Sequence, residues 1–186
     1  MLIGLVGKKR AGKDSFASRL TSAHGFVRYA FADPLKALML ELDPFVDSTI
    51  DIERDTRGVR LSEVIAEIGW EGAKEIPEVR RLLQAHGDAA RRHIGEDVWL
   101  SATMEKVLRE PRPVVVTDVR YPNEADAIEA HGGTLVRIIR TGRQDNDNHI
   151  TETALDDRRT PYVVLNSGTL GDLYGYADAL VRALSR

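Results

Sequence analysis

A glycine-rich segment near the start of the chain constrains its fold more than any other feature. The apolar run at residues 2–6 is followed at once by Gly7-Lys8-Lys9-Arg10-Ala11-Gly12-Lys13, and a helical pattern begins at the lysine. The spacing G-x-x-x-x-G-K belongs to the phosphate-loop (P-loop) pattern, in which backbone N–H groups surround phosphates and the lysine reaches the outer ones. The positive end of the following helix points at the same anion. This order of strand, loop and helix favours a nucleotide-phosphate site over a glycine-rich turn without a ligand.

The loop departs from the common pattern directly after the lysine. Ser or Thr usually stands there, but this chain has Asp14, with Ser15 one place later. We interpret Ser15 as taking over part of the magnesium-binding role, directly or through water. Asp14 is interpreted as capping or orienting the start of the helix.

Composition narrows the class of protein. At 186 residues the chain is long enough for one well-buried core but short for two independent domains, so we expect a single domain over residues 1–186. The net charge of −3 gives no general attraction to nucleic acid, and we expect no direct nucleic-acid binding. The chain has no cysteine, which excludes disulfides, a thiol nucleophile and cysteine metal sites.

Hydropathy adds an expectation about location. No apolar run is long enough to cross a bilayer, and the first apolar stretch lacks the basic start and longer apolar core of a signal peptide. We therefore expect a cytoplasmic protein with no membrane partner. The sequence leaves the choice between a monomer and a homodimer open.

Strand and helix patterns alternate along the chain, as in an α/β fold with a mainly parallel sheet. Strands are expected at residues 2–6, 26–31, 113–117, 134–139 and 162–165. Helices are expected at residues 13–23, 34–42, 61–69, 78–93, 98–109, 123–130 and 169–184. Five strands with helical crossovers suffice for a small P-loop kinase core, with a mainly parallel five-stranded sheet flanked by helices.

Apolar spacing also predicts which helix faces are buried. One set of core positions lies in the helix at 98–109: Leu100, Met104, Val107 and Leu108. A second set lies in the last helix: Leu170, Leu173, Ala177, Leu180, Val181 and Leu184.

Two polar stretches interrupt the alternation. Residues 43–60 are polar, charged and weakly periodic, so we expect an exposed, flexible loop or flap, on the side of the molecule where a phosphate acceptor would bind. Residues 140–160 form a second polar stretch, and a compact domain seldom keeps a connection of that length unless it is a lid or disordered. We interpret it as a lid loop.

Polar residues follow the predicted strands at the edge where ligands gather in open parallel sheets, outside the carboxyl ends of the strands. Besides the glycine loop, these are Asp33 after the second strand and Asp118 with Arg120 after the third. Asp118 has the position of a Walker-B carboxylate, which holds magnesium directly or through water. An aspartate that caps the following turn fits the same spacing. Arg120 either grips a phosphate or pairs with Asp118.

Asp33 would face the acceptor side of the phosphate loop. There it could accept a hydrogen bond from substrate or help to order the attacking group, and its alternative role is a helix N-cap beside Pro34. Lys36, one turn further on, either reaches an acceptor phosphate or is solvated.

Arg140 and Arg143 flank Gly142 at the start of the second polar stretch. A closing lid would bring their guanidinium groups onto the transferring phosphoryl group, whose transition-state charge arginine stabilises. A lid also excludes water. Solvated surface positions are the alternative for both arginines. His149 and Glu152 lie in the same stretch, and a metal site there would need further ligands that the sequence does not reveal.

In their order along the chain, these blocks resemble the phage-type deoxynucleoside monophosphate kinases, which belong to the P-loop nucleoside monophosphate kinase group. The resemblance runs nearly end to end. It rests on Gly12-Lys13-Asp14-Ser15, Phe31-Ala32-Asp33-Pro34-Leu35-Lys36, Arg81-Leu82-Leu83-Gln84 with Gly87, Gly95-Glu96-Asp97-Val98-Trp99, Thr117-Asp118-Val119-Arg120-Tyr121-Pro122-Asn123-Glu124, His149 with Glu152, and Asn166-Ser167-Gly168-Thr169-Leu170. Asp14 is no exception there, because this family is similar in carrying Gly-Lys-Asp followed by Ser or Thr.

The resemblance implies transfer of the γ-phosphoryl group of ATP, with magnesium, to a deoxynucleoside 5′-monophosphate. By this likeness ATP is held by Gly7, Lys8, Arg10, Ala11, Gly12, Lys13, Asp14 and Ser15. We expect substrate binding by Asp33, Lys36, Arg81, Gln84, Trp99, Asp118 and Arg120. We expect catalysis by Lys13, Asp33, Arg120, Arg140 and Arg143, and metal binding by Ser15 and Asp118. Gln84 has both donor and acceptor atoms with which to read a base edge.

Two other functions are compatible with the loop. One is another small P-loop kinase, such as one that acts on dephospho-coenzyme A, and the other is a nucleotide-gated switch that acts through a partner. A switch would not need a second basic pocket or a lid flanked by arginines. We therefore favour the kinase.

Overall fold

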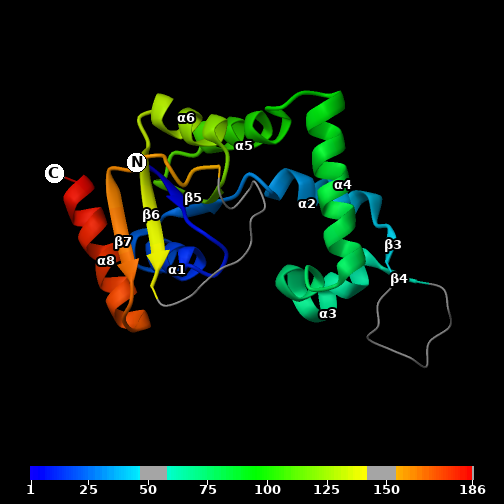
Figure 1. Cartoon of the computed structure of the whole chain (residues 1–186), viewed down its shortest axis with the longest axis horizontal. Helices are drawn as coiled ribbons and strands as arrows, with labels where there is room; N and C mark the ends of the chain where they lie inside the picture. The colour runs from blue at the N-terminus through cyan, green and yellow to red at the C-terminus, as the bar shows by residue number, and fades with distance from the viewer. Residues whose placement is uncertain (47–57, 142–153, 186) are drawn as a thin grey trace. The chain divides into compact units, whose positions relative to one another are not determined.

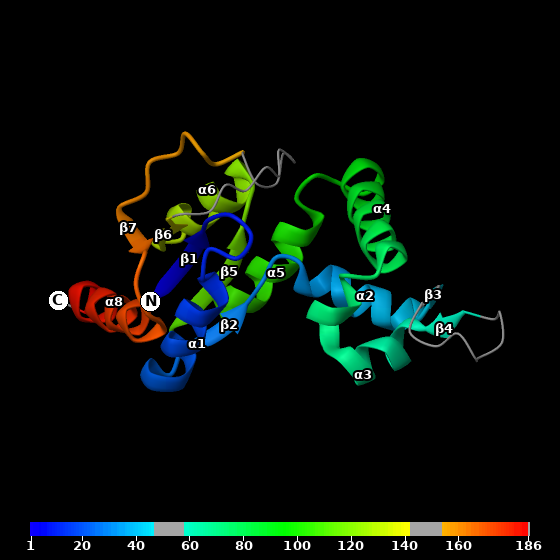
Figure 2. The same ribbon diagram turned by 60° about the horizontal axis from the view of Figure 1, so that its bottom comes forward.

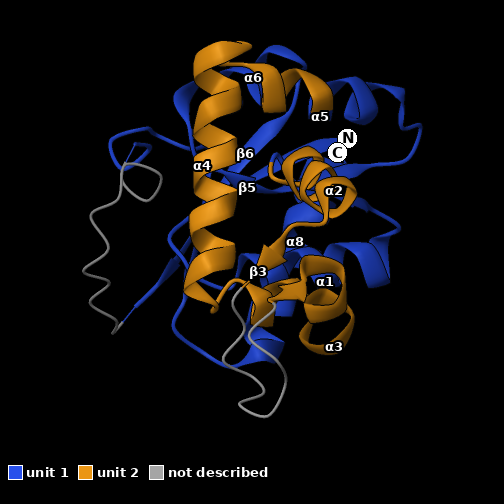
Figure 3. Cartoon of the chain, turned by 90° about the vertical axis from the view of Figure 1, so that its right-hand side faces the viewer, with its two compact units in different colours: residues 1–31, 103–186 blue, residues 32–102 orange. Residues whose placement is uncertain are grey.

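The computed structural model describes residues 1–46, 58–141 and 154–185. These residues form two compact units, shown in different colours in Figure 3, and each is described by itself below. Unit 1 comprises residues 1–31 and 103–186, and unit 2 comprises residues 32–102. The expected single domain over residues 1–186 stays a prediction.

Unit 1 is built on a five-stranded parallel sheet with the strand order β2-β5-β1-β6-β7 (Figure 1). The strands are β1 (Leu2–Val6), β2 (Val27–Tyr29), β5 (Val114–Val119), β6 (Thr134–Arg140) and β7 (Tyr162–Asn166). β1 lies in the centre, where Gly4 is opposite Val116 of β5 and Leu135 of β6. The predicted α/β fold with a mainly parallel five-stranded sheet is confirmed.

Helices cover both faces of this sheet, which explains why its central strands are apolar throughout. Figures 1 and 2 show α1 (Lys13–His24) and α8 (Leu170–Leu184) on one side and α6 (Pro122–Ala130) on the other. Phe16 and Leu20 of α1 and Leu173 of α8 enter one core with alternate side chains of the strands. On the opposite face, Ile128 of α6 packs beside Gly4. The glycine loop, which joins β1 to α1, is therefore fixed at both ends by buried structure.

A charged cluster joins α1 to α8. Arg19 donates from Nε and Nη2 to the two carboxylate oxygens of Asp178, each at 2.8 Å. His24 Nε2 lies 2.8 Å from Asp178 Oδ1, and the Arg19 guanidinium stands 5.8 Å from the ring centroid of Tyr174. The hydrogen bonds from Arg19, and then that from His24, hold the pKa of Asp178 well below its ordinary value. The carboxylate thus favours the folded state as long as it is ionised.

Unit 2 is mainly helical. It contains α2 (Asp33–Leu42), α3 (Leu61–Ala73), α4 (Pro77–His93), the start of α5 (Val98–Arg109), and an antiparallel pair of β3 (Phe45–Val46) with β4 (Val59–Arg60). Its core is formed by Met39, Val46, Leu61, Val64, Ala73, Ile76 and Val79. Asp43, which ends α2, accepts hydrogen bonds from the N–H and hydroxyl of Ser62 at 2.8 and 3.0 Å. This carboxylate therefore joins the end of α2 to the start of α3.

Several expected boundaries and core positions differ from the structure. The expected flap at residues 43–60 begins in β3 and ends in β4, and residues 47–57 lie outside the described residues. The third predicted strand continues to Val119, because Val119 pairs with Val6 of β1. Leu108 and Leu170 are 54% exposed and not part of the core. Each of these leucines stands at the end of its helix, where apolar spacing alone does not predict burial.

Across the described residues, every helix is too short or too polar to span a bilayer.

The charged cluster predicts a pH-dependent stability. Asp178→Asn should lower the midpoint of urea unfolding at pH 7, because Arg19 and His24 then face a neutral amide. The folded-state pKa of Asp178 lies below the ordinary aspartate value of about 3.9, so the stabilisation is complete at neutral pH and is lost as the pH falls below that value. The difference between the two proteins should therefore stay constant from pH 7 to about pH 5 and narrow in more acidic solution. Asp157→Asn, at an exposed position, is the control. Equal midpoints for wild type and Asp178→Asn at pH 7 would show that the cluster does not stabilise the fold.

Candidate active site

The loop between β1 and α1 has an open backbone, and at two of its positions a side chain would collide with the neighbouring strands. Gly7, Arg10 and Gly12 have positive φ angles of 150°, 62° and 108°. A Cβ on Gly7 would overlap the carbonyl oxygen of Ile138 in β6, and a Cβ on Gly12 would lie 2.6 Å from Asn166 Nδ2 at the end of β7. The loop backbone therefore lies directly against the carboxyl ends of two neighbouring strands.

The first turn of α1 begins inside this loop. Gly12 is the N-cap residue and has no side chain to accept hydrogen bonds from the first helical N–H groups. Asp14 lies inside the first turn, two residues after the N-cap, and its charge favours the positive helix end. Ser15 lies in the same turn and is half-buried. A phosphate is the type of ligand that an uncapped helix start accepts.

Two side chains hold the loop in place. The Lys13 ammonium group donates to the carbonyl oxygens of Gly7 and Lys8, the latter at 2.9 Å. Asn166 Nδ2 donates to the carbonyl oxygen of Ala11, also at 2.9 Å. These contacts turn carbonyl oxygens of the loop toward protein donors.

The end of β5 carries the predicted carboxylate. Asp118 Oδ1 accepts a hydrogen bond of 2.7 Å from the N–H of Phe31, two residues before Asp33 in the chain. The turn after β5 is held by Glu124, which is buried and accepts from the N–H groups of Arg120 and Tyr121 at 2.7 and 3.0 Å. Glu124 therefore caps this turn as part of a capping box with Tyr121.

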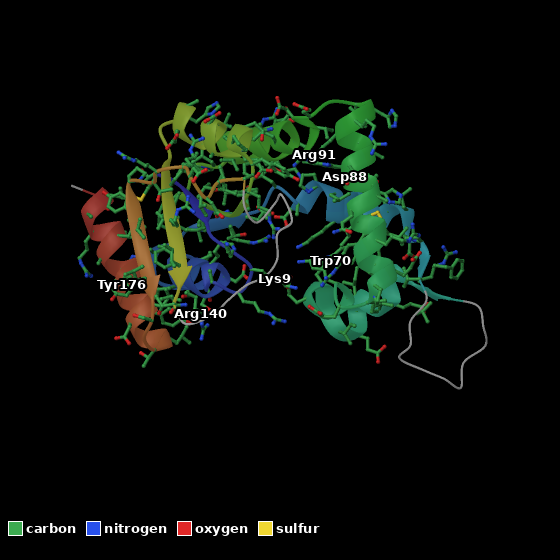
Figure 4. The ribbon with its side chains drawn as sticks, viewed as in Figure 1. Lys9, Trp70, Asp88, Arg91, Arg140 and Tyr176 are labelled. Atoms are coloured by element: carbon green, nitrogen blue, oxygen red, sulfur yellow. The ribbon has the colours of Figure 1, made fainter. Side chains whose placement is uncertain are left out.

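The end of β6 carries Arg140, which is exposed and lies opposite Asn166 of β7 in the strand pairing. Figure 4 shows Arg140 and the loop residue Lys9 at the same edge of the sheet. Of the expected lid at residues 140–160, only its first two residues and residues 154–160 are described. Arg143, His149 and Glu152 lie outside the described residues.

Residues 154–160 are tied to unit 1 by charged side chains. Arg137 Nη2 donates to the carbonyl oxygens of Leu155 and Arg158 at 2.6 and 2.8 Å. Arg158 in turn pairs with Asp126 of α6 at 2.7 Å and also with Glu129 of α6. The far end of the expected lid is thus anchored on the sheet and on α6.

The expected acceptor residues lie in unit 2. Asp33 is half-buried and opens α2 after the N-cap Ala32, so it is not itself the cap. Lys36 Nζ stands 5.6 Å from the ring centroid of Trp70. Trp99 is buried, and its Nε1 donates to the carbonyl oxygen of Gly87 at 3.2 Å.

Arg81 and Gln84 both lie on α4 and are exposed. Arg81 donates from Nε and Nη2 to the carboxylate of Glu78 at 2.8 and 2.7 Å, which also lowers the pKa of Glu78. Any phosphate that Arg81 holds must therefore compete with Glu78 or use the remaining guanidinium donors.

The predicted residues thus fall into two groups. The ATP-binding residues, Asp118, Arg120 and Arg140 belong to unit 1, and Asp33, Lys36, Arg81, Gln84 and Trp99 belong to unit 2. Sequence reasoning gave no role to Asn166, Glu124 or Trp70. Only Glu124 had a local signal, because a glutamate three residues after a helix N-cap is typical of a capping box.

The close approach of Gly7 to the carbonyl oxygen of Ile138 predicts that a side chain at position 7 destabilises the fold. Gly7→Ala should lower the free energy of unfolding by about 1–3 kcal/mol, because the new Cβ overlaps a backbone oxygen that cannot rotate away. Gly175→Ala in α8 is the matched control, since a Cβ there meets nothing within 4 Å, and it should raise the stability by about 0.8 kcal/mol. Urea denaturation measures both changes. A Gly7→Ala protein as stable as wild type would mean that the loop does not lie against β6.

A family model described as deoxynucleotide monophosphate kinase matches residues 48–176. Among solved structures, shikimate kinase from Aquifex aeolicus covers 100% of this chain and 98% of its own with a TM-score of 0.49 and 12% identity. The deoxynucleotide monophosphate kinase of Enterobacteria phage T4 is 27% identical over 239 residues, covering 98% of this chain and 99% of that protein. A putative deoxynucleotide monophosphate kinase of Acanthamoeba polyphaga mimivirus is 31% identical over 191 residues, which cover 94% of this chain and 92% of that protein. By the family model and these viral relatives, the chain belongs to the deoxynucleotide monophosphate kinase family.

Proposed function

We propose that this protein transfers the γ-phosphoryl group of ATP to a deoxynucleoside 5′-monophosphate, giving ADP and the deoxynucleoside diphosphate. One observation carries the proposal. This chain belongs to the family, and it has an open glycine loop, a lysine ammonium group and an uncapped helix start together at the carboxyl end of β1. These groups are those that an enzyme needs to hold a triphosphate.

The triphosphate is proposed to bind in the loop. Its oxygens would accept from backbone N–H groups of the loop and of the first turn of α1, where the helix dipole favours negative charge. Lys13 would exchange the carbonyl oxygens of Gly7 and Lys8 for phosphate oxygens. The exchange is favourable because the ammonium group then faces ionised oxygens instead of neutral ones. Asp14 in the first turn limits how much negative charge the site attracts.

Magnesium fits this donor set. The described residues contain no group of three or more acidic or histidine side chains that could hold a metal by themselves. Magnesium does not need one, because it is usually held by one or two carboxylates together with substrate phosphates and water. Asp118 and Ser15 are the proposed protein contributions, and the hydrogen bond from the Phe31 N–H keeps the Asp118 carboxylate in place. When bound, the ion would neutralise charge on the β- and γ-phosphate oxygens.

The acceptor is proposed to be held by unit 2. Arg81 would use its remaining guanidinium donors on the acceptor phosphate, and Gln84, three residues along the same helix, would read a base edge. Asp33 would order the attacking group, and Lys36 would add positive charge for the acceptor phosphate. Trp99 has a supporting role here, because it is buried and its N–H is bound to Gly87 of α4.

Arg120, Arg140 and Arg143 are proposed to stabilise charge that develops on the transferring phosphoryl group. Arginine suits this task because its planar guanidinium group always carries charge and binds phosphate oxygens in pairs. The buried carboxylate of Glu124 fixes the backbone of Arg120, which limits the positions that this guanidinium can take.

An acceptor screen tests the proposal. Full-length protein with ATP and magnesium should convert one or more deoxynucleoside monophosphates to diphosphates, while ribonucleoside monophosphates, dephospho-coenzyme A and buffer alone serve as the comparison. Chromatography resolves the products. Transfer to dephospho-coenzyme A instead, or slow ATP hydrolysis that no monophosphate accelerates, would overturn the proposal.

The role of Lys13 predicts a loss of activity without a loss of fold. Lys13→Ala should keep the fold, measured by circular dichroism, but lower kcat by about 10²–10³-fold, because it removes a preorganised donor to developing charge. A near-normal kcat for Lys13→Ala would refute the role of the lysine.

The base-reading role of Gln84 predicts a separate effect. Gln84→Ala should raise the KM for the preferred deoxynucleoside monophosphate by about tenfold, as expected for one or two lost hydrogen bonds, with little change in the KM for ATP. Because Gln84 is exposed, the stability should hardly change. Lys106→Ala, an exposed change in α5, is the control. Steady-state kinetics with each substrate varied in turn measures both constants, and an unchanged acceptor KM would count against the assignment.

A further inference from the structure

The last strand of the sheet reaches the phosphate loop through one side chain. Asn166 ends β7 and is half-buried, and its Nδ2 donates to the carbonyl oxygen of Ala11 at 2.9 Å, across 155 residues of chain. We propose that Asn166 is a positioning residue, which fixes the Ala11–Gly12 peptide so that the Gly12 N–H stays directed at the bound phosphates. The inference rests on the proposed function, since it assigns this N–H to the triphosphate of the donor.

The argument begins with the geometry of a peptide bond. The chain has no cis peptide among its described residues, so the Ala11–Gly12 peptide is trans and planar. In a trans peptide the C=O and the N–H point in opposite directions. A donor that holds the Ala11 carbonyl on one side therefore also fixes the direction of the Gly12 N–H on the other, and Asn166 supplies such a donor.

The loop needs such a restraint because of its glycine. Gly12 has a φ angle of 108°, which only glycine adopts readily, and the missing Cβ that permits this conformation also permits rotation of the preceding peptide. A rotated peptide would present the Ala11 carbonyl oxygen to the phosphates in place of an N–H. A carbonyl oxygen beside an anion is repulsive, so the population of rotated loops directly reduces phosphate affinity.

Packing holds the amide group where it is needed. A Cβ on Gly12 would lie 2.6 Å from Asn166 Nδ2 and 3.2 Å from Leu173 Cδ2, so the amide of Asn166 fills the space beside the glycine. In the sheet, Asn166 is paired with Arg140 at the end of β6, which places its backbone within a regular ladder. The side chain is short and its base is rigid, as expected for a residue that orients another group.

The donor chemistry at this position is specific. An aspartate has nearly the same shape but offers only acceptors, so its carboxylate would face the Ala11 carbonyl oxygen and repel it. An alanine removes the hydrogen bond and leaves the peptide unrestrained. A role in packing alone would depend on volume, whereas the proposed role depends on the N–H donor.

Binding of inorganic tripolyphosphate to the full chain, measured by calorimetry, tests the inference without requiring catalysis. Asn166→Ala should weaken tripolyphosphate binding about tenfold, the scale of one misdirected hydrogen bond to a charged group, and Asn166→Asp should weaken it further. The KM for ATP should rise in parallel, while the KM for the deoxynucleoside monophosphate should not change. Because Asn166→Asp keeps the side-chain volume, it gives an answer even if Asn166→Ala does not fold.

Val164→Ala is the matched control, two residues earlier in β7 and buried in the core without a polar contact to the loop. It should lower Tm but leave tripolyphosphate affinity within about twofold of wild type. The inference is overturned if wild type does not bind tripolyphosphate, if both Asn166 variants bind it as wild type does, or if Val164→Ala loses as much affinity as they do. The proposed function fails separately: tripolyphosphate binding that depends on Asn166, in a protein that phosphorylates no deoxynucleoside monophosphate, supports this inference and refutes that function.

Discussion

The missing side chains of Gly7 and Gly12 are the constraint on which the candidate site depends. They let the phosphate loop lie against the carbonyl oxygen of Ile138 in β6 and the amide of Asn166 in β7, distances that no Cβ would permit. The position of the loop is set by the central strand β1, which ends in the loop and pairs with β5 on one side and β6 on the other. The start of α1 follows within the loop itself, so the same steric condition determines the direction of the helix dipole. A side chain at either position would force a shift between the loop and the ends of β6 and β7.

Three polar side chains then fix the backbone around that site. Asn166 holds the Ala11 carbonyl, Asp118 holds the Phe31 N–H, and Glu124 holds the Arg120 N–H. Each acts on a connection that follows a strand of unit 1, where the backbone has no ladder partner of its own. Catalysis by positioned charges requires groups that do not reorganise during the reaction. These hydrogen bonds supply that rigidity at the connections, while the apolar core supplies it within the strands.

How much of this could be predicted depends on how local each cause is. The strands, the loop and the helix at Lys13 follow from short patterns, and the structure confirms them. Apolar spacing placed Leu108 and Leu170 in the core, but spacing does not reveal where a neighbouring element ends, and both are exposed. The capping box after β5 has a local cause, because a glutamate stands three residues after the helix N-cap. The contact between Asn166 and Ala11 joins residues 155 positions apart. No periodicity or spacing rule encodes such a pair, because only the order of the strands in the sheet brings it together.

Three of the candidate cations have partners within their own unit. Lys13 is bound to two loop carbonyl oxygens, Arg81 to the carboxylate of Glu78, and Lys36 stands over the ring of Trp70. A ligand that used these three cations would exchange these interactions for its own. The exchange favours ligands whose oxygens are fully ionised, because a phosphate oxygen is a stronger partner than a backbone carbonyl or an aromatic ring. For Arg81 the competitor is itself a carboxylate, so a phosphate gains little from charge alone and must use guanidinium donors that Glu78 leaves available. Under the proposed function, selectivity for the acceptor would then have to come from groups beyond the phosphate, which is the role proposed for Gln84.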